Sequence, residues 1–186
     1  PGCHGIFAFR ASLPDPKTEL AEYLKHNNDV DDPRYHAFVR PLVDLVASRQ
    51  KREDRGLDFG AGPGPVVTRM LSERGYSLAL YDPYFFPDSG VLSTPYDYIV
   101  SCEVIEHFYH PYESFRLLSK LLAPGGTLYC RTTLVPDEIP FPRWHYKNDV
   151  THVFLYHRKT IAWIATHVLD CTHTIVDKNL IMFSRT

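Results

Sequence analysis

The chain has 186 residues, of which 44% are hydrophobic and 13% aromatic, as is typical of a globular protein with one sizeable core. Its formal net charge of −2 gives no general attraction to nucleic acids or anionic membranes. Its apolar runs fall short of the roughly 18 residues that a membrane-spanning helix needs. The four cysteines form no Cys-x-x-Cys pair, so we expect reduced thiols and a cytoplasmic protein.

Helix-like and strand-like segments alternate along the chain. Apolar residues at helical spacing, with capping and stop residues around them, predict helices over 18–28, 32–49, 65–75, 112–126 and 157–168. Short apolar runs predict strands over 55–60, 76–82, 97–104, 127–135, 174–177 and 180–185. This order predicts an α/β fold with a mostly parallel sheet that helices cover on both faces.

We expect a single domain over residues 1–186, with its core over residues 55–186. Residues 1–35 form an N-terminal extension, for which two interpretations stand. It is either a surface helix and loop, or a lid whose Tyr23, His26 or Asn27 closes over a bound cofactor and excludes water.

The stretch LDFGAGPGPVV, which follows the first predicted sheet strand, carries glycines at positions 60, 62 and 64. Ligands of such sheets bind beyond the carboxyl ends of the strands. A glycine turn at that place allows backbone to approach a ligand closely. We therefore expect a nucleotide-like ligand to lie against this turn.

The spacing of the glycines narrows the class of ligand. A P-loop requires a lysine that this stretch lacks, and a dinucleotide turn requires GxGxxG rather than GxGxG. Pro63 and Pro65 have no backbone N–H, so two donors that a pyrophosphate would use are missing. The turn favours a ligand without phosphates, such as S-adenosylmethionine.

The second predicted strand ends in Asp82. An acidic side chain at that position can accept both hydroxyl groups of an adenosine ribose. This holds for NAD and for S-adenosylmethionine alike, so Asp82 indicates an adenosine ligand without separating the two.

Four segments together carry a family resemblance: LDFGAGPG, YDPYF, YDYIVSCEVIEHF and LLAPGGTLYCRTT. In order and spacing they resemble the Rossmann-like S-adenosylmethionine-dependent methyltransferases. EVIEH and HYKNDVTHVFLYHRKTIAWIA look like the ubiquinone-biosynthesis-like branch, which acts on small molecules. The resemblance covers about residues 55–186. It implies a doubly wound sheet of seven strands, with six as the alternative, and an antiparallel last strand.

The resemblance also implies which residues bind the cofactor. Asp58 and the glycine turn would face the methionine half, Asp82 the ribose, and Cys102 would contact the cofactor through its backbone. The full set of expected cofactor residues is Tyr23, Asp58, Gly60, Gly62, Gly64, Asp82, Tyr84 and Cys102.

One departure concerns the adenine. Family members carry a further helix and strand after the ribose acid, but here only about fifteen residues separate Asp82 from Asp97. We expect Tyr84 or Phe85 to cover the adenine face by stacking.

Three histidines are candidates for the acceptor side: His107, His145 and His152. Their ordinary pKa lies near neutrality, so any of them can act as a general base toward a hydroxyl acceptor. A structural hydrogen bond or simple exposure is the alternative for each. Glu103 and Glu106 are expected at the start of a helix, where capping and a favourable interaction with the helix N-terminus is the simple interpretation for one of them.

These features favour a methyltransferase that moves the sulfonium methyl of S-adenosylmethionine to a small-molecule acceptor by in-line displacement, leaving S-adenosylhomocysteine. The alternatives are an RNA methyltransferase, for example on a tRNA base, and a non-catalytic partner subunit that only binds cofactor; an NAD enzyme ranks last.

We expect no metal, because Cys3 and His4 cannot supply four ligands. Further aromatic residues are expected in the core or the pocket wall: Tyr81, Tyr84, Phe85, Phe86 and Trp144. The oligomeric state stays open.

Overall fold

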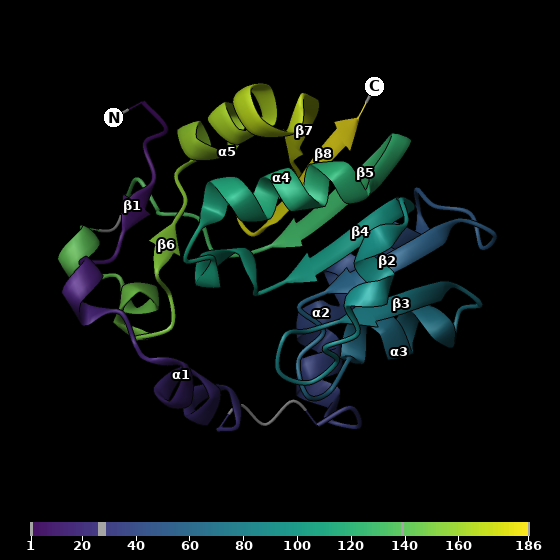
Figure 1. The fold of residues 1–186 in the computed structure, drawn as a ribbon, viewed down its shortest axis with the longest axis horizontal. Coiled ribbons are helices and arrows are strands. Elements are labelled where there is room, and N and C mark those ends of the chain that lie inside the picture. Colours follow the sequence, from purple (N-terminus) through teal and green to yellow (C-terminus); the bar gives the residue numbers. More distant parts are fainter. Residues whose placement is uncertain (1, 26–28, 139, 186) are drawn as a thin grey trace.

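The computed structural model of the protein describes residues 2–25, 29–138 and 140–185. In it, a six-stranded sheet runs through the centre of the molecule (Figure 1). Its strands, in spatial order, are β3 (Ser77–Tyr81), β2 (Arg55–Phe59), β4 (Tyr96–Cys102), β5 (Leu122–Arg131), β8 (Leu180–Arg185) and β7 (Cys171–Ile175). The preferred expectation of seven strands is wrong, and the six-stranded alternative is confirmed. Between β3 and β4 the chain forms only a 3-10 turn, η2 (Ser89–Ser93), which is too short for a further helix and strand.

The first four strands of this order are parallel. β8 runs antiparallel to both of its neighbours, β5 and β7, as expected for the last strand. β4 is apolar on both faces, with Tyr98, Ile99 and Val100 fully buried. Such two-sided burial is typical of a parallel sheet between two helical layers.

Helices cover both faces of the sheet. α2 (Pro33–Ala47) and α3 (Val66–Ser72) pack on one face. α4 (Pro111–Leu121) and α5 (Arg158–Ile164), which continues into a π-helical turn (Ala165–Leu169), pack on the other. The apolar side chains of α4 recur at helical spacing and are buried, which directs that helix onto the sheet. Within the described ranges, each helix is too short or too polar to cross a membrane.

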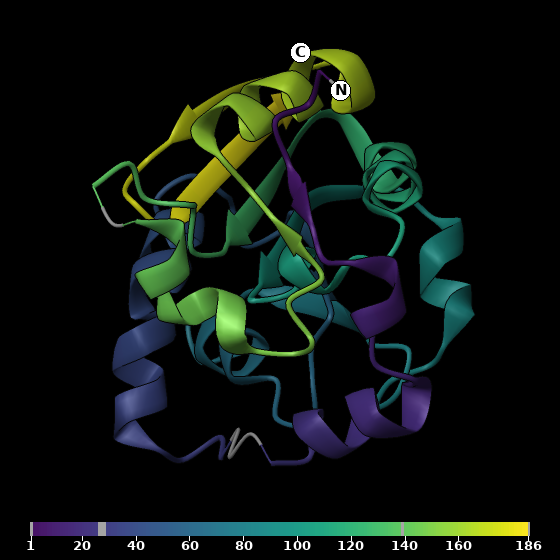
Figure 2. The same cartoon turned by 90° about the vertical axis from the view of Figure 1, so that its left-hand side faces the viewer.

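A two-stranded ribbon and a short helix flank the sheet. β1 (Ile6–Phe7) pairs antiparallel with β6 (Phe154–Leu155), and α1 (Pro16–Tyr23) follows (Figure 2). α1 begins earlier than expected because Asp15 caps it, accepting hydrogen bonds from the backbone N–H groups of Lys17 and Thr18. The arrowheads of β4 and β5 point toward the side of the molecule where α1 and the ribbon lie (Figure 1). The carboxyl ends of the strands therefore face this added layer.

The strand order changes direction at β2. The chain passes from β2 to β3 on one side and then crosses to β4 on the other side. Connections that leave the sheet in opposite directions open a crevice at the carboxyl ends of β2 and β4. The glycine turn follows β2, so the fold brings it to this crevice.

Candidate functional site

A cavity of about 710 Å³ lies at the carboxyl ends of β2, β3 and β4. All eight residues expected to bind cofactor line it: Tyr23, Asp58, Gly60, Gly62, Gly64, Asp82, Tyr84 and Cys102. His107 and His152 line it too, whereas His145 is exposed and does not. His26 and Asn27, the other lid candidates, lie outside the described residues.

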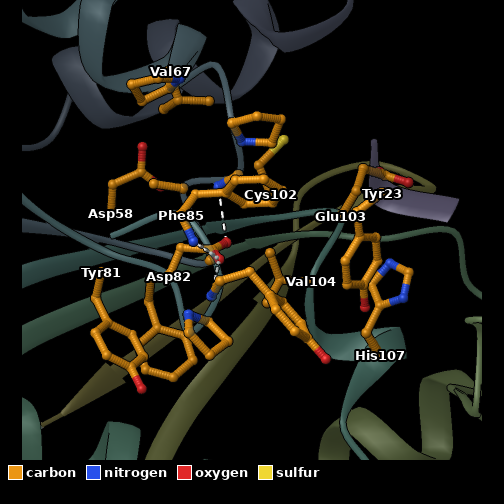
Figure 3. A pocket seen from close by; sticks show the side chains of 18 of the residues that line it. Tyr23, Asp58, Val67, Tyr81, Asp82, Phe85, Cys102, Glu103, Val104 and His107 are labelled. Carbon is orange, nitrogen blue, oxygen red and sulfur yellow. Dashed lines mark hydrogen bonds between the residues drawn. The ribbon is translucent and has the colours of Figure 1, made fainter. Parts of the chain in front are cut away.

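The cavity has two halves, which we name by their contents. The glycine half contains Asp58, the glycine turn (residues 60–64) and Asp82. The histidine half contains Tyr23, Glu103, His107, Asp149 and His152. Figure 3 shows Asp58 and Asp82 on one side, and Tyr23, Glu103 and His107 on the other.

Backbone geometry explains the first glycine of the turn. Gly60 has a φ of +82°, and a Cβ at this position would lie 2.5 Å from a methyl carbon of Val104. The N–H groups of Gly60 and Ala61 donate to the carbonyl of Tyr81 at 2.8 and 3.1 Å, which ties the turn to the end of β3. A side chain here would clash with Val104 and strain the backbone.

Asp82 is held by three backbone donors. Its carboxylate accepts hydrogen bonds from the N–H groups of Gly62 (3.0 Å), Tyr84 (2.8 Å) and Phe85 (3.1 Å), drawn as dashed lines in Figure 3. A carboxylate has about four acceptor positions, so about one remains for a ligand. The side chain is therefore fixed in orientation and still able to accept a hydroxyl hydrogen.

Asp58 is buried on the floor of the same half. It accepts a hydrogen bond from the Thr68 hydroxyl at 2.7 Å, and burial raises its pKa to about 6. The cavity wall carries Glu19, Asp58, Asp82, Glu103 and Asp149, and among the described residues that line it there is neither lysine nor arginine. Such a wall suits a cationic ligand and offers a pyrophosphate neither lysine nor arginine.

Aromatic side chains form the wall beside Asp82. The rings of Tyr84 and Phe85 lie 6.4 Å apart, and both residues line the cavity. Tyr35 and Phe38 of α2 stack on each other at 6.0 Å and line the same cavity. The sequence did not single out this second pair, although both residues lie near the start of a predicted helix. Trp144, which was expected either in the core or in the pocket wall, is in the core.

The two histidines of the cavity are oriented by main-chain carbonyls. His107 Nδ1 is 2.9 Å from the carbonyl oxygen of Thr151, and His152 Nδ1 is 2.7 Å from that of Tyr146. Because a carbonyl oxygen only accepts, each Nδ1 carries a hydrogen and donates it. In the neutral rings the lone pair is then on Nε2. The rings lie 5.0 Å apart.

Two carboxyl groups, Glu103 and Glu106, meet at the hydroxyl of Tyr146. Burial raises the pKa of both, and at Glu103 the neighbouring Glu106 raises it further. The hydroxyl contacts an oxygen of Glu106 and lies 3.1 Å from one of Glu103. It has one hydrogen, so it can donate to only one carboxylate at a time.

The capping interpretation of these glutamates is wrong. The segment after β4 forms a single 3-10 turn, η3 (Ile105–His107), and not the start of an α-helix. Glu106 is fully buried beneath this turn. Glu103 has a φ of +54°, a left-handed conformation that costs a non-glycine residue roughly 1–2 kcal/mol.

Helix α1 covers the cavity through several contacts. Glu19, which is only 9% exposed, accepts hydrogen bonds from the hydroxyls of Tyr23 (2.7 Å) and Tyr84 (2.8 Å). The ring of Tyr23 lies edge-on to His107 at 5.4 Å. The Tyr109 hydroxyl donates to the carbonyl of Pro14 at 3.1 Å. Glu19 was missed, although its i, i+4 spacing to Tyr23 indicates that both share one helical face.

The second missed residue is Asp149. It accepts hydrogen bonds from the backbone N–H and the hydroxyl of Thr151, and one of its oxygens is 3.8 Å from His152 Nε2. It lies in the same polar segment, HYKNDVTH, as the candidate histidines. The sequence could have indicated Asp149 through its position between two of these candidate histidines, His145 and His152.

Comparison with known proteins gives the family. A model described as "Methyltransferase domain" matches residues 32–168, so the chain belongs to this methyltransferase family. The matched range begins after α1. A search of curated proteins found no significant match.

Solved structures show the same fold at low identity. An O-methyltransferase family protein from Burkholderia thailandensis is 15% identical with a TM-score of 0.60; the match covers 95% of this chain but only 65% of that one. The 1,6-didemethyltoxoflavin-N1-methyltransferase of the same organism, solved with its substrate and S-adenosylhomocysteine, is 14% identical with a TM-score of 0.60, covering 94% and 92%. Phosphoethanolamine N-methyltransferase 2 from Haemonchus contortus, solved with S-adenosylmethionine, is 17% identical with a TM-score of 0.55, covering 73% and 38%.

Proposed function

We propose that this chain binds S-adenosylmethionine in the glycine half of the cavity and transfers its methyl group to a small-molecule acceptor in the histidine half. One observation carries the proposal: the eight residues expected to bind cofactor, which come from four separate parts of the chain, line one cavity together with His107 and His152. Its volume, about 710 Å³, is within the range of about 300–1,000 Å³ typical of small-molecule sites.

The charges of the cavity wall support this cofactor. When bound, S-adenosylmethionine supplies a methyl group activated by a positively charged sulfur. The acidic wall, with Asp58 and Asp82 in the glycine half, suits that positive charge. Asp82 would accept a ribose hydroxyl, and Tyr84 or Phe85 would cover the adenine. The glycine turn would let the rest of the cofactor lie against backbone.

The histidine half supports a role in positioning and deprotonating the acceptor. In the neutral form of His107 and His152 the lone pair is on Nε2, which is the nitrogen that accepts a proton from a hydroxyl. Tyr23 and Glu19 on α1 would close the site and exclude water, as a lid does. Alignment of donor and acceptor would account for most of the rate enhancement.

The wall also favours a small acceptor over RNA. RNA recognition depends on lysine and arginine that neutralise phosphates, and the described cavity-lining residues include neither. An acceptor without phosphates fits these acidic and aromatic walls better.

Calorimetry with S-adenosylhomocysteine tests the cofactor site. Asp82→Ala should weaken binding roughly 10- to 100-fold, because hydrogen bonds to a charged group are lost. Asp88→Ala, which changes an exposed carboxylate in the same loop region, is the matched control and should bind as the wild type does. Asp82 also organises the turn, so Asp82→Asn and thermal melting check that the fold is retained.

Two outcomes oppose the proposal. Absence of wild-type binding to both S-adenosylmethionine and S-adenosylhomocysteine would remove the cofactor assignment. Cofactor binding without methyl transfer to any member of a broad small-molecule panel, assayed with methyl-labelled cofactor, would favour a non-catalytic partner subunit.

A further inference from the structure

Three potential metal ligands lie close together: His107 and His152 line the histidine half, and Glu106 is fully buried. One carboxylate oxygen of Glu106 and one ring nitrogen each of His107 and His152 lie within 4.8 Å of one another. Glu106 and His107 come from the turn after β4, and His152 comes from the segment before β6. The fold therefore brings His152 to two adjacent ligands that precede it by 45 and 46 positions in the sequence.

The spacing of these atoms is close to what a bound cation requires. Nitrogen and oxygen ligands bind zinc tetrahedrally at about 2.0–2.2 Å, so two ligand atoms of one ion are about 3.4 Å apart. A separation of up to 4.8 Å can close to this value through side-chain rotations. Both rings are only partly buried and line the cavity, so the wall allows such movement.

The orientation of the histidines matches that of metal ligands. Metal-binding histidines usually donate their second ring N–H to a carbonyl or carboxylate, which fixes the ring and leaves the other nitrogen for the metal. Here both Nδ1 atoms donate to main-chain carbonyls, those of Thr151 and Tyr146. In the neutral rings the lone pair is then on Nε2, and at His152 this nitrogen also lies 3.8 Å from an oxygen of Asp149, which a cation bound at Nε2 would attract.

Glu106 supplies an independent indication. It is fully buried, and one of its two side-chain oxygens, Oε2, makes no hydrogen bond within the described part of the chain. The same is true of Oε1 of Glu103, whose nearest cationic partner, Arg131 Nε, is 3.6 Å away. Buried polar atoms without a partner are costly, and a bound ion can compensate for that cost.

We propose that Glu106, His107 and His152 form a binding site for one divalent first-row transition-metal ion. Two imidazole nitrogens and one carboxylate suit zinc, manganese, iron or cobalt better than calcium or magnesium, which favour oxygen ligands. Three protein ligands leave coordination positions open toward the cavity.

The open positions suggest what the ion does, and this step rests on the proposed function. An acceptor oxygen bound there would be positioned beside the glycine half, and the ion would favour its ionised form. The inference narrows the class of acceptor from small molecules in general to small molecules with an ionisable hydroxyl group. It also replaces the simple general-base role of the two histidines with ligation.

Cobalt titration tests the site without using enzyme activity. The tag-free, metal-depleted chain is titrated with Co²⁺, and visible absorption together with calorimetry reports the coordination and the stoichiometry. We expect one Co²⁺ per chain. His107→Ala and His152→Ala should each weaken binding on the order of 100-fold or more, since even residues that only support a ligand alter affinity about 10- to 100-fold. His173→Ala, which removes an exposed histidine on β7, is the matched control and should bind Co²⁺ as the wild type does.

Further variants keep the two proposals separable. Asp82→Ala should lose affinity for S-adenosylhomocysteine and retain Co²⁺ binding, whereas His152→Ala should do the opposite. His152→Gln provides a second variant of similar size if His152→Ala does not fold, as judged by thermal melting. Failure of the wild type to bind Co²⁺, or equal binding by both histidine variants and wild type, would overturn the metal site and leave the cofactor assignment intact.

Discussion

The two halves of the cavity are built in different ways. In the glycine half, the main features are backbone groups: a turn with positive φ values and a carboxylate that three N–H groups hold. In and directly beside the histidine half, side chains from separate segments meet one another: His107 lies beside His152 within it, and Glu103 contacts Tyr146, which also contacts the buried Glu106. The residues that make the glycine half lie within about 25 consecutive positions, from Asp58 to Asp82. The histidine half is made by side chains that lie far apart in the sequence and meet only in the folded chain.

This difference has a physical consequence. A site made from backbone is sensitive to any added side chain, because atoms cannot move without shifting the strand ends. A site made from side chains tolerates small movements but depends on every buried polar group being satisfied. Substitutions in the two halves should therefore affect cofactor affinity and stability differently.

Gly60→Ala is expected to have the largest effect. The added Cβ would contact Val104 at 2.5 Å and would require a φ of +82°, so we expect a loss of about 3 kcal/mol in the free energy of unfolding, together with a large loss of S-adenosylhomocysteine affinity. Denaturant unfolding and calorimetry measure the two effects. Gly125→Ala is the matched control: its φ is +76°, but a Cβ there meets no atom within 4 Å, so only about 1 kcal/mol of strain is expected, with unchanged affinity. Equal effects of the two changes would mean that the Val104 contact is unimportant.

Tyr146→Phe tests whether the histidine half is independent of the glycine half. Loss of the hydroxyl leaves the buried carboxyl groups of Glu106 and Glu103 without their shared partner, so we expect about 2 kcal/mol of destabilisation. Affinity for S-adenosylhomocysteine should stay within twofold of wild type. Tyr112→Phe, at a side chain that is 53% exposed, should leave stability within about 0.5 kcal/mol of wild type. A loss of cofactor affinity as large as that of Gly60→Ala would show that the halves act as one unit.

The same contrast explains what could be predicted from the sequence. The parallel sheet, the helical layers and the glycine half follow from local patterns, because periodicity and a glycine turn act over a few residues. The seventh strand was predicted from family resemblance, and the short segment between Asp82 and Asp97 leaves no room for it. Glu106 was given a capping role because its true partner, Tyr146, is 40 positions away and no local pattern links them. Glu19 was missed for a related reason, since its partner Tyr84 is 65 positions away.

Asp58 is the buried side chain through which the glycine half should respond most clearly to pH. Burial raises its pKa to about 6 in the folded chain, above an unfolded value of about 3.9. A raised folded pKa means that the stabilising contribution of Asp58 is complete below the unfolded pKa and is lost as the pH rises through 6. Asp58→Asn does not titrate and can still accept the hydrogen bond from Thr68. Without cofactor, the free energy of unfolding of the wild type minus that of Asp58→Asn should therefore fall by about 1 kcal/mol between pH 5 and pH 8. Denaturant titrations at both pH values measure this difference. A difference that does not change with pH would mean that Asp58 is more hydrated than its position at the end of β2 indicates, and that the glycine half already admits solvent before any ligand binds.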